Sequence, residues 1–133
     1  MIKWAIPHHL ARSPRPGNKH LPAQKKEVLA WMEEARALGM RSIICLLSKE
    51  ELHDYYQHVG IDLLQCYQKA GLEVAHHPLS EYGTPPISSE TLVRIGSDYQ
   101  RLPKPCLVHC NAGIERTGKV IDYLLRLGRY ALP

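Results

Sequence analysis

An unbroken apolar run, Ile43–Leu47, lies inside the segment 41–47 and contains no alternating polar residue. A strand of this kind is typical of a sheet that is covered on both faces. Apolar residues that alternate or cluster between turn signals predict three more strands, at 2–6, 72–79 and 105–109. Helices are predicted at 22–38, 49–59, 63–70, 88–102 and 117–127. Strands that alternate with helices predict an α/β fold with a central, mostly parallel sheet flanked by helices.

Local signals set the expected ends of these elements. Ser48 begins a capping box, which predicts the start of a short helix. Pro22 suits the first turn of the helix at 22–38, and Gly128 is expected to end the helix at 117–127. The segment 7–22 contains four prolines, so it is predicted to be a loop. With 133 residues and no long linker, residues 1–133 are expected to form a single domain.

Composition excludes several classes of protein. The formal net charge of +4 suits an anionic substrate but is too small to support nucleic-acid binding. Four cysteines at irregular spacing, with no CxxC, argue against a zinc ribbon and a disulfide framework. They favour a reducing compartment, and no secretory signal or membrane span is visible, so a cytoplasmic location is expected. The pairs His8-His9 and His76-His77 lack an HExxH pattern, so no metal is expected.

The segment between the last predicted strand and the last helix carries the clearest chemical pattern. Cys110 follows the strand, Gly113 lies in the middle of the loop, and Arg116 opens the helix. A curled loop with glycine can turn its amides inward, and a helix N-terminus adds a partial positive charge. Arginine matches two phosphate oxygens with its planar fork. This environment favours the thiolate of Cys110, a nucleophile that faces a bound phosphoryl group.

The loop resembles the signature of the cysteine-dependent protein tyrosine phosphatases, HCxxGxxR followed by Ser or Thr. It matches at His109, Cys110, Gly113, Arg116 and Thr117. The stretches 4–16 and 78–86 also resemble the opening and the acid loop of the small atypical dual-specificity phosphatases. The preceding His and the Arg-Thr pair fit poorly with the rival interpretation, a rhodanese-like sulfurtransferase. A structural cysteine near an incidental arginine is the other alternative.

The resemblance implies a role for each residue of the site. Cys110 would form a cysteinyl-phosphate, Thr117 would hydrogen-bond Cys110 and help the thiolate leave, and His109 would order the loop. The family uses an upstream Asp as general acid, whereas the matching position here holds Glu81. Alternatives are an acid supplied by Glu115 or no acid at all. The phosphate would be bound by the side chain of Arg116 and by backbone amides of the loop, which are those of Asn111, Ala112, Gly113, Ile114, Glu115 and Arg116. No cofactor is implied.

The substrate class is narrowed by the loop. Phosphoinositide-type members usually carry lysines there, whereas this chain has Asn111 and Ile114, with Glu115 beside them. This favours phosphotyrosine, with phosphoserine and phosphothreonine as further possibilities, on a protein or a small phosphomonoester. An RNA 5′-phosphatase uses a similar loop and remains an alternative. A phosphate-binding module with weak catalysis is the alternative from another class, supported by the exchange of Asp for Glu81.

Other residues have less specific interpretations. Arg12 and Arg15 either line the site or belong to a solvated basic loop, and the second is favoured. Cys106 lies near Cys110 in sequence, but strand geometry does not favour a disulfide between them. Cys45 and Cys66 are expected in the core. Members of the family usually have further helices after the one that follows the loop, and the oligomeric state is not predicted.

Overall fold

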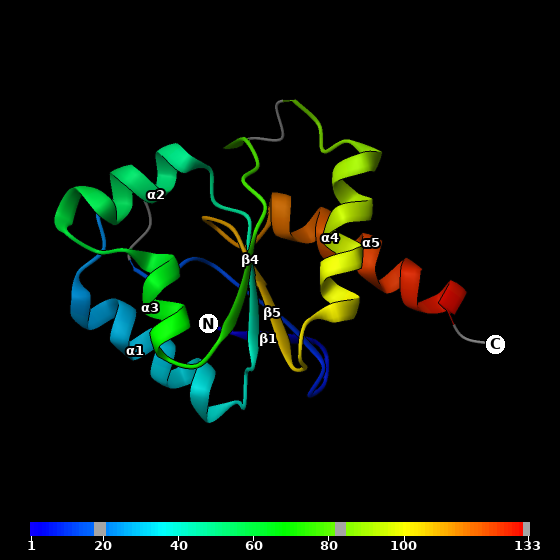
Figure 1. Ribbon diagram of the computed structural model, residues 1–133, viewed down its shortest axis with the longest axis horizontal. Helices are drawn as coiled ribbons and strands as arrows, with labels where there is room; N and C mark the ends of the chain where they lie inside the picture. Colours follow the sequence, from blue (N-terminus) through cyan, green and yellow to red (C-terminus); the bar gives the residue numbers. More distant parts are fainter. Residues whose placement is uncertain (18–20, 82–84, 132–133) are drawn as a thin grey trace.

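The computed structural model describes residues 1–17, 21–81 and 85–131, which fold around one five-stranded sheet (Figure 1). The strand order is β1-β2-β5-β3-β4, and neighbouring strands are parallel except for the antiparallel pair β1 and β2. The strands are β1 (Lys3–Ile6), β2 (Leu10–Ser13), β3 (Ser42–Cys45), β4 (Glu73–His76) and β5 (Cys106–His109). The predicted mostly parallel α/β sheet is therefore confirmed.

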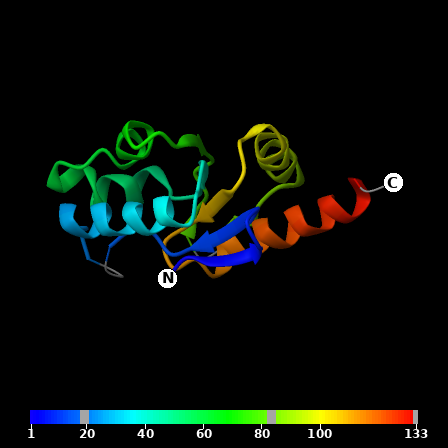
Figure 2. The same ribbon diagram turned by 90° about the horizontal axis from the view of Figure 1, so that it is seen from below.

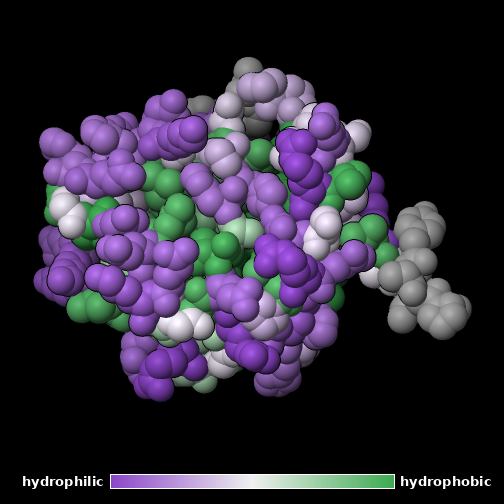
Figure 3. Space-filling view, viewed as in Figure 1, coloured by the Kyte–Doolittle hydropathy of each residue, from purple (hydrophilic) through white to green (hydrophobic). Residues whose placement is uncertain are grey.

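Helices cover both faces of the sheet (Figures 1 and 2). On one side lie α1 (Lys25–Ala37), α2 (Lys49–Tyr55), a short 3-10 helix η1 (Gln57–Val59) and α3 (Leu63–Lys69). On the other side lie α4 (Ser89–Arg101) and α5 (Glu115–Ala131). Seen as in Figure 1, hydrophilic residues cover most of this face, and hydrophobic ones show in smaller patches between them, one of them at the centre near β4 (Figure 3).

Two hydrophobic clusters divide the core at the sheet. Ile43 and Leu107 pack with residues of α1, α2 and α3, whereas their neighbours Ile44 and Val108 pack with residues of α4 and α5. Successive strand residues point to opposite faces, so a strand with no polar alternation fills both clusters. This is the packing expected from the apolar run of β3.

The prediction of a loop over 7–22 is wrong, because β2 lies within it. Leu10 and Ala11 are fully buried, and β2 runs parallel to β5 with Leu10 opposite Cys106. The prolines at 7 and 14 flank this strand and leave its own residues free to pair. Proline therefore marks the ends of the strand here, not an absence of structure.

Two helix boundaries also differ from the predictions. Helix α1 begins at Lys25, after Pro22, where the backbone amide of Gln24 donates to the Glu27 carboxylate at 2.8 Å. Helix α5 continues through Gly128 to Ala131. Tyr123 and Leu127 of α5 lie against Gly96 of α4, and this helix–helix packing outweighs the stop signal of a single glycine.

The capping signal predicted at Ser48 is confirmed, and two further helices are capped in the same way. The Ser48 hydroxyl accepts from the amide of Glu51, Asp62 caps α3, and Ser88 caps α4. In the part of the chain that is described, no helix has both the length and the apolar character needed to cross a membrane.

Candidate active site

Cys110 directly follows β5, and the loop that it begins ends at α5, on the carboxyl side of the parallel strands. This is the side where open α/β sheets bind ligands. The backbone at Gly113 has a φ of +74°, and its amide lies 3.3 Å from Cys110 Sγ, to which it donates. Cys110 is 2% exposed. The expected inward curl of the loop is thus confirmed at Gly113.

The loop lies directly against the end of β2. A Cβ atom built on Gly113 would be 2.6 Å from both the carbonyl carbon of Ser13 and the nitrogen of Pro14. Those are backbone atoms, so they cannot move aside as a flexible side chain would. Glycine is therefore required here for both its conformation and its lack of a side chain.

The Arg116 side chain, in the first turn of α5, is held by Glu51 of α2. Nη1 donates to Oε1 at 2.6 Å and Nη2 donates to Oε2 at 2.9 Å, in a bidentate pair. Arg116 Nη1 also donates to the Leu79 carbonyl at 3.1 Å. Glu51 is 5% exposed and Arg116 4% exposed, so water competes little with these bonds.

The two partners keep each other charged. Burial by itself raises the pKa of Glu51, but hydrogen bonds from Arg116 and the Ser48 backbone, with the Arg116 charge, bring it below its ordinary value. Burial likewise opposes the charge of Arg116, but the Glu51 carboxylate raises the pKa of Arg116 above its ordinary value. Both groups are therefore ionised at neutral pH.

This pair leaves one edge of the guanidinium unused. Among the described residues, Arg116 Nε has no hydrogen-bond acceptor, and Nη2 uses only the bond to Glu51. A guanidinium has five N–H donors in a fixed plane, so the Nε–Nη2 edge can still bind two oxygens of a phosphoryl group.

His109 is completely buried beneath the loop. Its Nδ1 lies 3.2 Å from the carbonyl of Cys110, and its Nε2 lies 2.9 Å from the Tyr67 hydroxyl. A carbonyl can only accept, so Nδ1 carries the proton and Nε2 accepts from Tyr67. Burial lowers the pKa of His109 to about 4, so the ring is neutral at physiological pH. The contact agrees with a residue that orders the loop.

Thr117 is placed as expected, but its hydroxyl is not. The residue is fully buried in the first turn of α5, and among the described residues its Oγ1 has no hydrogen-bond partner. The hydrogen bond to Cys110 that the family resemblance implies is therefore not formed in this structure.

The favoured interpretation of Arg12 and Arg15 as solvated residues is wrong. Arg15 is 2% exposed, with its Nη2 2.7 Å from the Leu21 carbonyl and its guanidinium 3.8 Å above the Tyr55 ring. Arg12 Nη2 donates to the carbonyl of Gly113 at 2.9 Å. Both lie against the loop because β2, which the sequence did not predict, contains Arg12 and leads directly to Arg15.

Glu81 lies at the edge of the site. Its Oε1 is 3.3 Å from Nδ2 of Asn111, and Asn111 Oδ1 accepts from Arg15 Nε at 2.9 Å. Residues 82–84 of the segment that resembles an acid loop lie outside the described residues. Ile114, on the outer side of the loop, is 68% exposed.

A groove of about 370 Å³ adjoins the loop between α2 and the residues after β4. It is lined by Ser48, Glu50, Glu51, Asp54, Tyr55, Ser80 and Glu81. Its four carboxylates make it acidic on the side where Arg116 meets Glu51.

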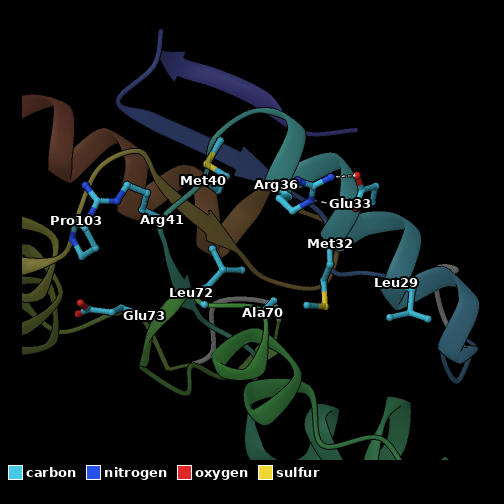
Figure 4. A pocket seen from close by; sticks show the side chains of 11 residues that line it. Leu29, Met32, Glu33, Arg36, Met40, Arg41, Ala70, Leu72, Glu73 and Pro103 are labelled. Carbon is cyan, nitrogen blue, oxygen red and sulfur yellow. Dashed lines mark hydrogen bonds and ion pairs between the residues drawn. The ribbon is translucent and has the colours of Figure 1, made fainter.

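A separate cavity of about 340 Å³ lies at the other end of the sheet, between α1 and the α3–β4 turn (Figure 4). Its walls include Met32, Leu72 and the ion pair of Glu33 and Arg36, and they contain none of the predicted site residues. Arg41 and Glu73, which also line it, lie at the amino ends of β3 and β4. It is therefore not part of the candidate active site.

The other cysteines and the pair His76-His77 lie in ordinary structural positions. All four cysteines are free, with Cys45 and Cys106 buried and Cys66 half-buried. Burial raises the pKa of Cys45 to about 12 and that of Cys106 to about 11. His76 and His77 have different partners. His76 Nε2 lies 2.7 Å from the Leu47 carbonyl oxygen, and His77 Nε2 lies 2.6 Å from a carboxylate oxygen of Asp98.

A family model and curated relatives both relate this chain to cyclin-dependent kinase inhibitor 3. The family described as cyclin-dependent kinase inhibitor 3 (CDKN3) matches residues 6–130. Cyclin-dependent kinase inhibitor 3 of Homo sapiens is 32% identical over 106 residues, covering 76% of this chain and 47% of that protein. The Mus musculus protein is 30% identical over 103 residues, again with 76% and 47% covered. The chain thus spans about half the length of these relatives.

Solved structures share the fold. Kinase associated phosphatase, with its catalytic cysteine replaced by serine, has a TM-score of 0.73 at 24% identity, covering 93% of this chain and 68% of that one. A glycine-to-alanine mutant form of Tk-PTP has a TM-score of 0.70 at 26% identity, covering 97% and 73%. The chain therefore belongs to the CDKN3 family of dual-specificity phosphatases, within the cysteine-dependent protein tyrosine phosphatase superfamily.

Proposed function

We propose that residues 1–133 form a dual-specificity-type phosphatase domain that hydrolyses phosphomonoesters through a cysteinyl-phosphate. One observation carries this proposal: Cys110 Sγ accepts the Gly113 amide beside Arg116, whose guanidinium Glu51 holds with one edge still free. Donors fixed in this way before the substrate arrives stabilise the charge of a transferring phosphoryl group.

In the first step the Cys110 thiolate attacks phosphorus. The S–P bond forms as the bond between phosphorus and the leaving oxygen breaks, and Glu81 gives its proton to that oxygen. The products are the free alcohol or phenol, the cysteinyl-phosphate and the Glu81 carboxylate. Expelling a tyrosine side chain unprotonated is costly, since its ordinary pKa is about 10.

In the second step water attacks the cysteinyl-phosphate. The Glu81 carboxylate takes a proton from the water, a P–O bond forms, and the S–P bond breaks to release inorganic phosphate and the Cys110 thiolate. Thr117 would stabilise the departing thiolate if its buried hydroxyl, which has no other partner among the described residues, turns toward it. The loop amides and Arg116 hold the phosphoryl oxygens throughout.

The surroundings of the site favour a phosphorylated protein as substrate, on tyrosine and also on serine or threonine. The carboxylates of Glu50, Asp54 and Glu81 line the adjoining groove, and Ile114 is exposed on the loop. Repulsion by these carboxylates disfavours ligands with many phosphates, such as phosphoinositides and RNA. Four free cysteines support a reducing location, and we place the protein in the cytoplasm on that ground.

The test is hydrolysis of p-nitrophenyl phosphate and phosphotyrosyl peptides with a chelator present. We expect turnover by the wild-type chain, none by Cys110→Ser, and a phosphorylated Cys110 in acid-quenched samples by mass spectrometry. Turnover by Cys110→Ser at a substantial fraction of the wild-type rate would remove the covalent mechanism. If the protein binds phosphate but shows no turnover, the result would support a phosphate-binding module. A preference for triphosphate RNA would support an RNA 5′-phosphatase.

A further inference from the structure

The Asn111 side chain lies between two groups that are far apart in the sequence. Its Oδ1 accepts from Arg15 Nε at 2.9 Å, and its Nδ2 donates to Glu81 Oε1 at 3.3 Å. Asn111 is 9% exposed and lies directly after the nucleophile. One amide therefore links a buried arginine of the β2 side to the candidate general acid.

The orientation of this amide is fixed by Arg15. A guanidinium has only donors, so only the amide oxygen can face it, and the NH₂ group must then face Glu81. Arg15 itself has little freedom, because it is buried, stacks on Tyr55 and donates to the Leu21 carbonyl at 2.7 Å. A rigid cation thus determines that a hydrogen-bond donor is directed toward Glu81.

The Asn111 N–H can keep the Glu81 carboxyl group away from the ion pair of Arg116 and Glu51. Glu81 lies near the buried ion pair, because it lines the same groove as Glu51 and its charge contributes to the raised pKa of Arg116. Attraction to Arg116 would draw an ionised Glu81 into the ion pair. A neutral N–H that binds Oε1 offers a competing contact, and it leaves Oε2 as the oxygen that carries the transferable proton.

We propose that the Asn111 side chain is a positioning residue that holds Glu81 at the leaving-group oxygen, in an orientation set by Arg15. This rests on the proposed function, in which Glu81 is the general acid. The role matters only where the leaving group needs a proton. It affects phenyl phosphate much more than p-nitrophenyl phosphate, whose leaving group is expelled readily as an anion.

Two substitutions separate the possible roles of Asn111. Asn111→Asp keeps an oxygen that accepts from Arg15 but has no N–H for Glu81. Asn111→Leu removes both contacts without adding charge. We expect each to lower kcat on phenyl phosphate about tenfold, because small errors of position are costly in proton transfer, and to change kcat on p-nitrophenyl phosphate less than about twofold.

Controls keep the result specific to Glu81. Glu81→Gln should show the same selective loss on phenyl phosphate, and Glu81→Gln with Asn111→Asp should lose no more than Glu81→Gln alone. Glu90→Gln, which removes a carboxylate from an exposed side chain of α4 outside the groove, should leave both substrates unaffected. Competitive inhibition by inorganic phosphate should be unchanged in Asn111→Leu, which keeps the backbone amide and adds no charge to the loop, showing an intact loop.

The inference is overturned if both substrates slow equally, if phosphate inhibition is lost, or if Asn111→Asp behaves like the wild type. The last result would mean that Asn111 only anchors Arg15. These outcomes require Cys110-dependent hydrolysis of p-nitrophenyl phosphate by the wild type. Absence of that hydrolysis overturns the proposed function together with this inference, whereas its presence with unselective variants removes the role of Asn111 alone.

Discussion

At Gly113 the backbone adopts a φ of +74°, and the residue lies against the backbone of Ser13 and Pro14. Gly60 has a similar φ of +82° but has no atom within 4 Å of the Cβ position. The two glycines therefore differ in close packing and not in conformation. Thr117, also in the site, is buried like Gly113, but its hydroxyl has no hydrogen-bond partner among the described residues.

Gly113→Ala should abolish phosphate binding and turnover, because the new methyl group would lie 2.6 Å from backbone atoms and the loop must shift. Gly60→Ala is the matched control. It should cost about 1 kcal/mol through left-handed strain alone and leave turnover intact. Steady-state kinetics and urea unfolding of both variants check this. Equal activity in the two would show that the contact with Ser13 and Pro14 is not needed.

Thr117→Val should leave the free energy of unfolding within about 1 kcal/mol of the wild type, or raise it, because a buried hydroxyl without a partner contributes nothing. Turnover should fall because the second step loses its hydroxyl, and the phosphorylated enzyme should accumulate as a larger burst in rapid-mixing experiments. An unchanged burst with unchanged turnover would limit Thr117 to packing.

At the scale of elements, the site is assembled from four segments. Helix α5 and the loop supply Arg116 and Cys110, and α2 supplies Glu51. β2 and the residues directly after it supply Arg12 and Arg15, and the stretch after β4 supplies Glu81. Glu51 has two functions, because the Ser48 amide donates to it at the start of α2 and the Arg116 side chain donates to it across the site. The start of α2 is thereby joined to the start of α5.

Glu51→Gln should destabilise the fold by about 3 kcal/mol, because it leaves the buried charge of Arg116 without a counter-ion. The pKa of Glu51 is lowered in the fold, so the pair contributes stability above the ordinary carboxyl pKa and loses it as pH falls. Urea unfolding of wild type and variant should therefore differ at neutral pH and converge in acid. Glu50→Gln, on the exposed side of α2, is the control, and a pH-independent difference would argue against the charged pair.

At the scale of the whole molecule, β5 lies in the middle of the sheet and joins the two hydrophobic clusters to the site. Leu107 packs toward α1–α3, Val108 packs toward α4 and α5, and His109 follows them as the last strand residue. The buried His109 contacts Tyr67 of α3 and packs in a T-shaped arrangement with the Trp31 ring of α1. The acid stability of the whole fold is thus linked to a residue beneath the loop.

The protein should lose stability between about pH 6.5 and pH 4. In the unfolded chain His109 takes up a proton near its ordinary pKa of about 6.5, whereas in the fold its pKa is about 4, so protons favour unfolding in this range. The loss is on the order of 3 kcal/mol. Unfolding at several pH values measures it. His109→Asn should flatten the curve and the exposed His53→Asn should not, whereas equal curves for all three proteins would contradict the assignment.

Short-range signals in the sequence predicted much of this molecule. The apolar run of β3, the cap at Ser48 and the pattern from Cys110 to Arg116 involve residues a few positions apart, so their meaning is local. They predicted the class of sheet, the start of α2 and the position of the candidate site.

Contacts between residues far apart in the sequence decided the rest of the structure. β2 forms because it pairs with β5, and Arg15 is buried because the loop and Tyr55 enclose it. Glu51 and Arg116 form an ion pair although their helices lie on opposite faces of the sheet. No local pattern encodes such contacts, because each depends on groups that only packing of the whole chain brings together.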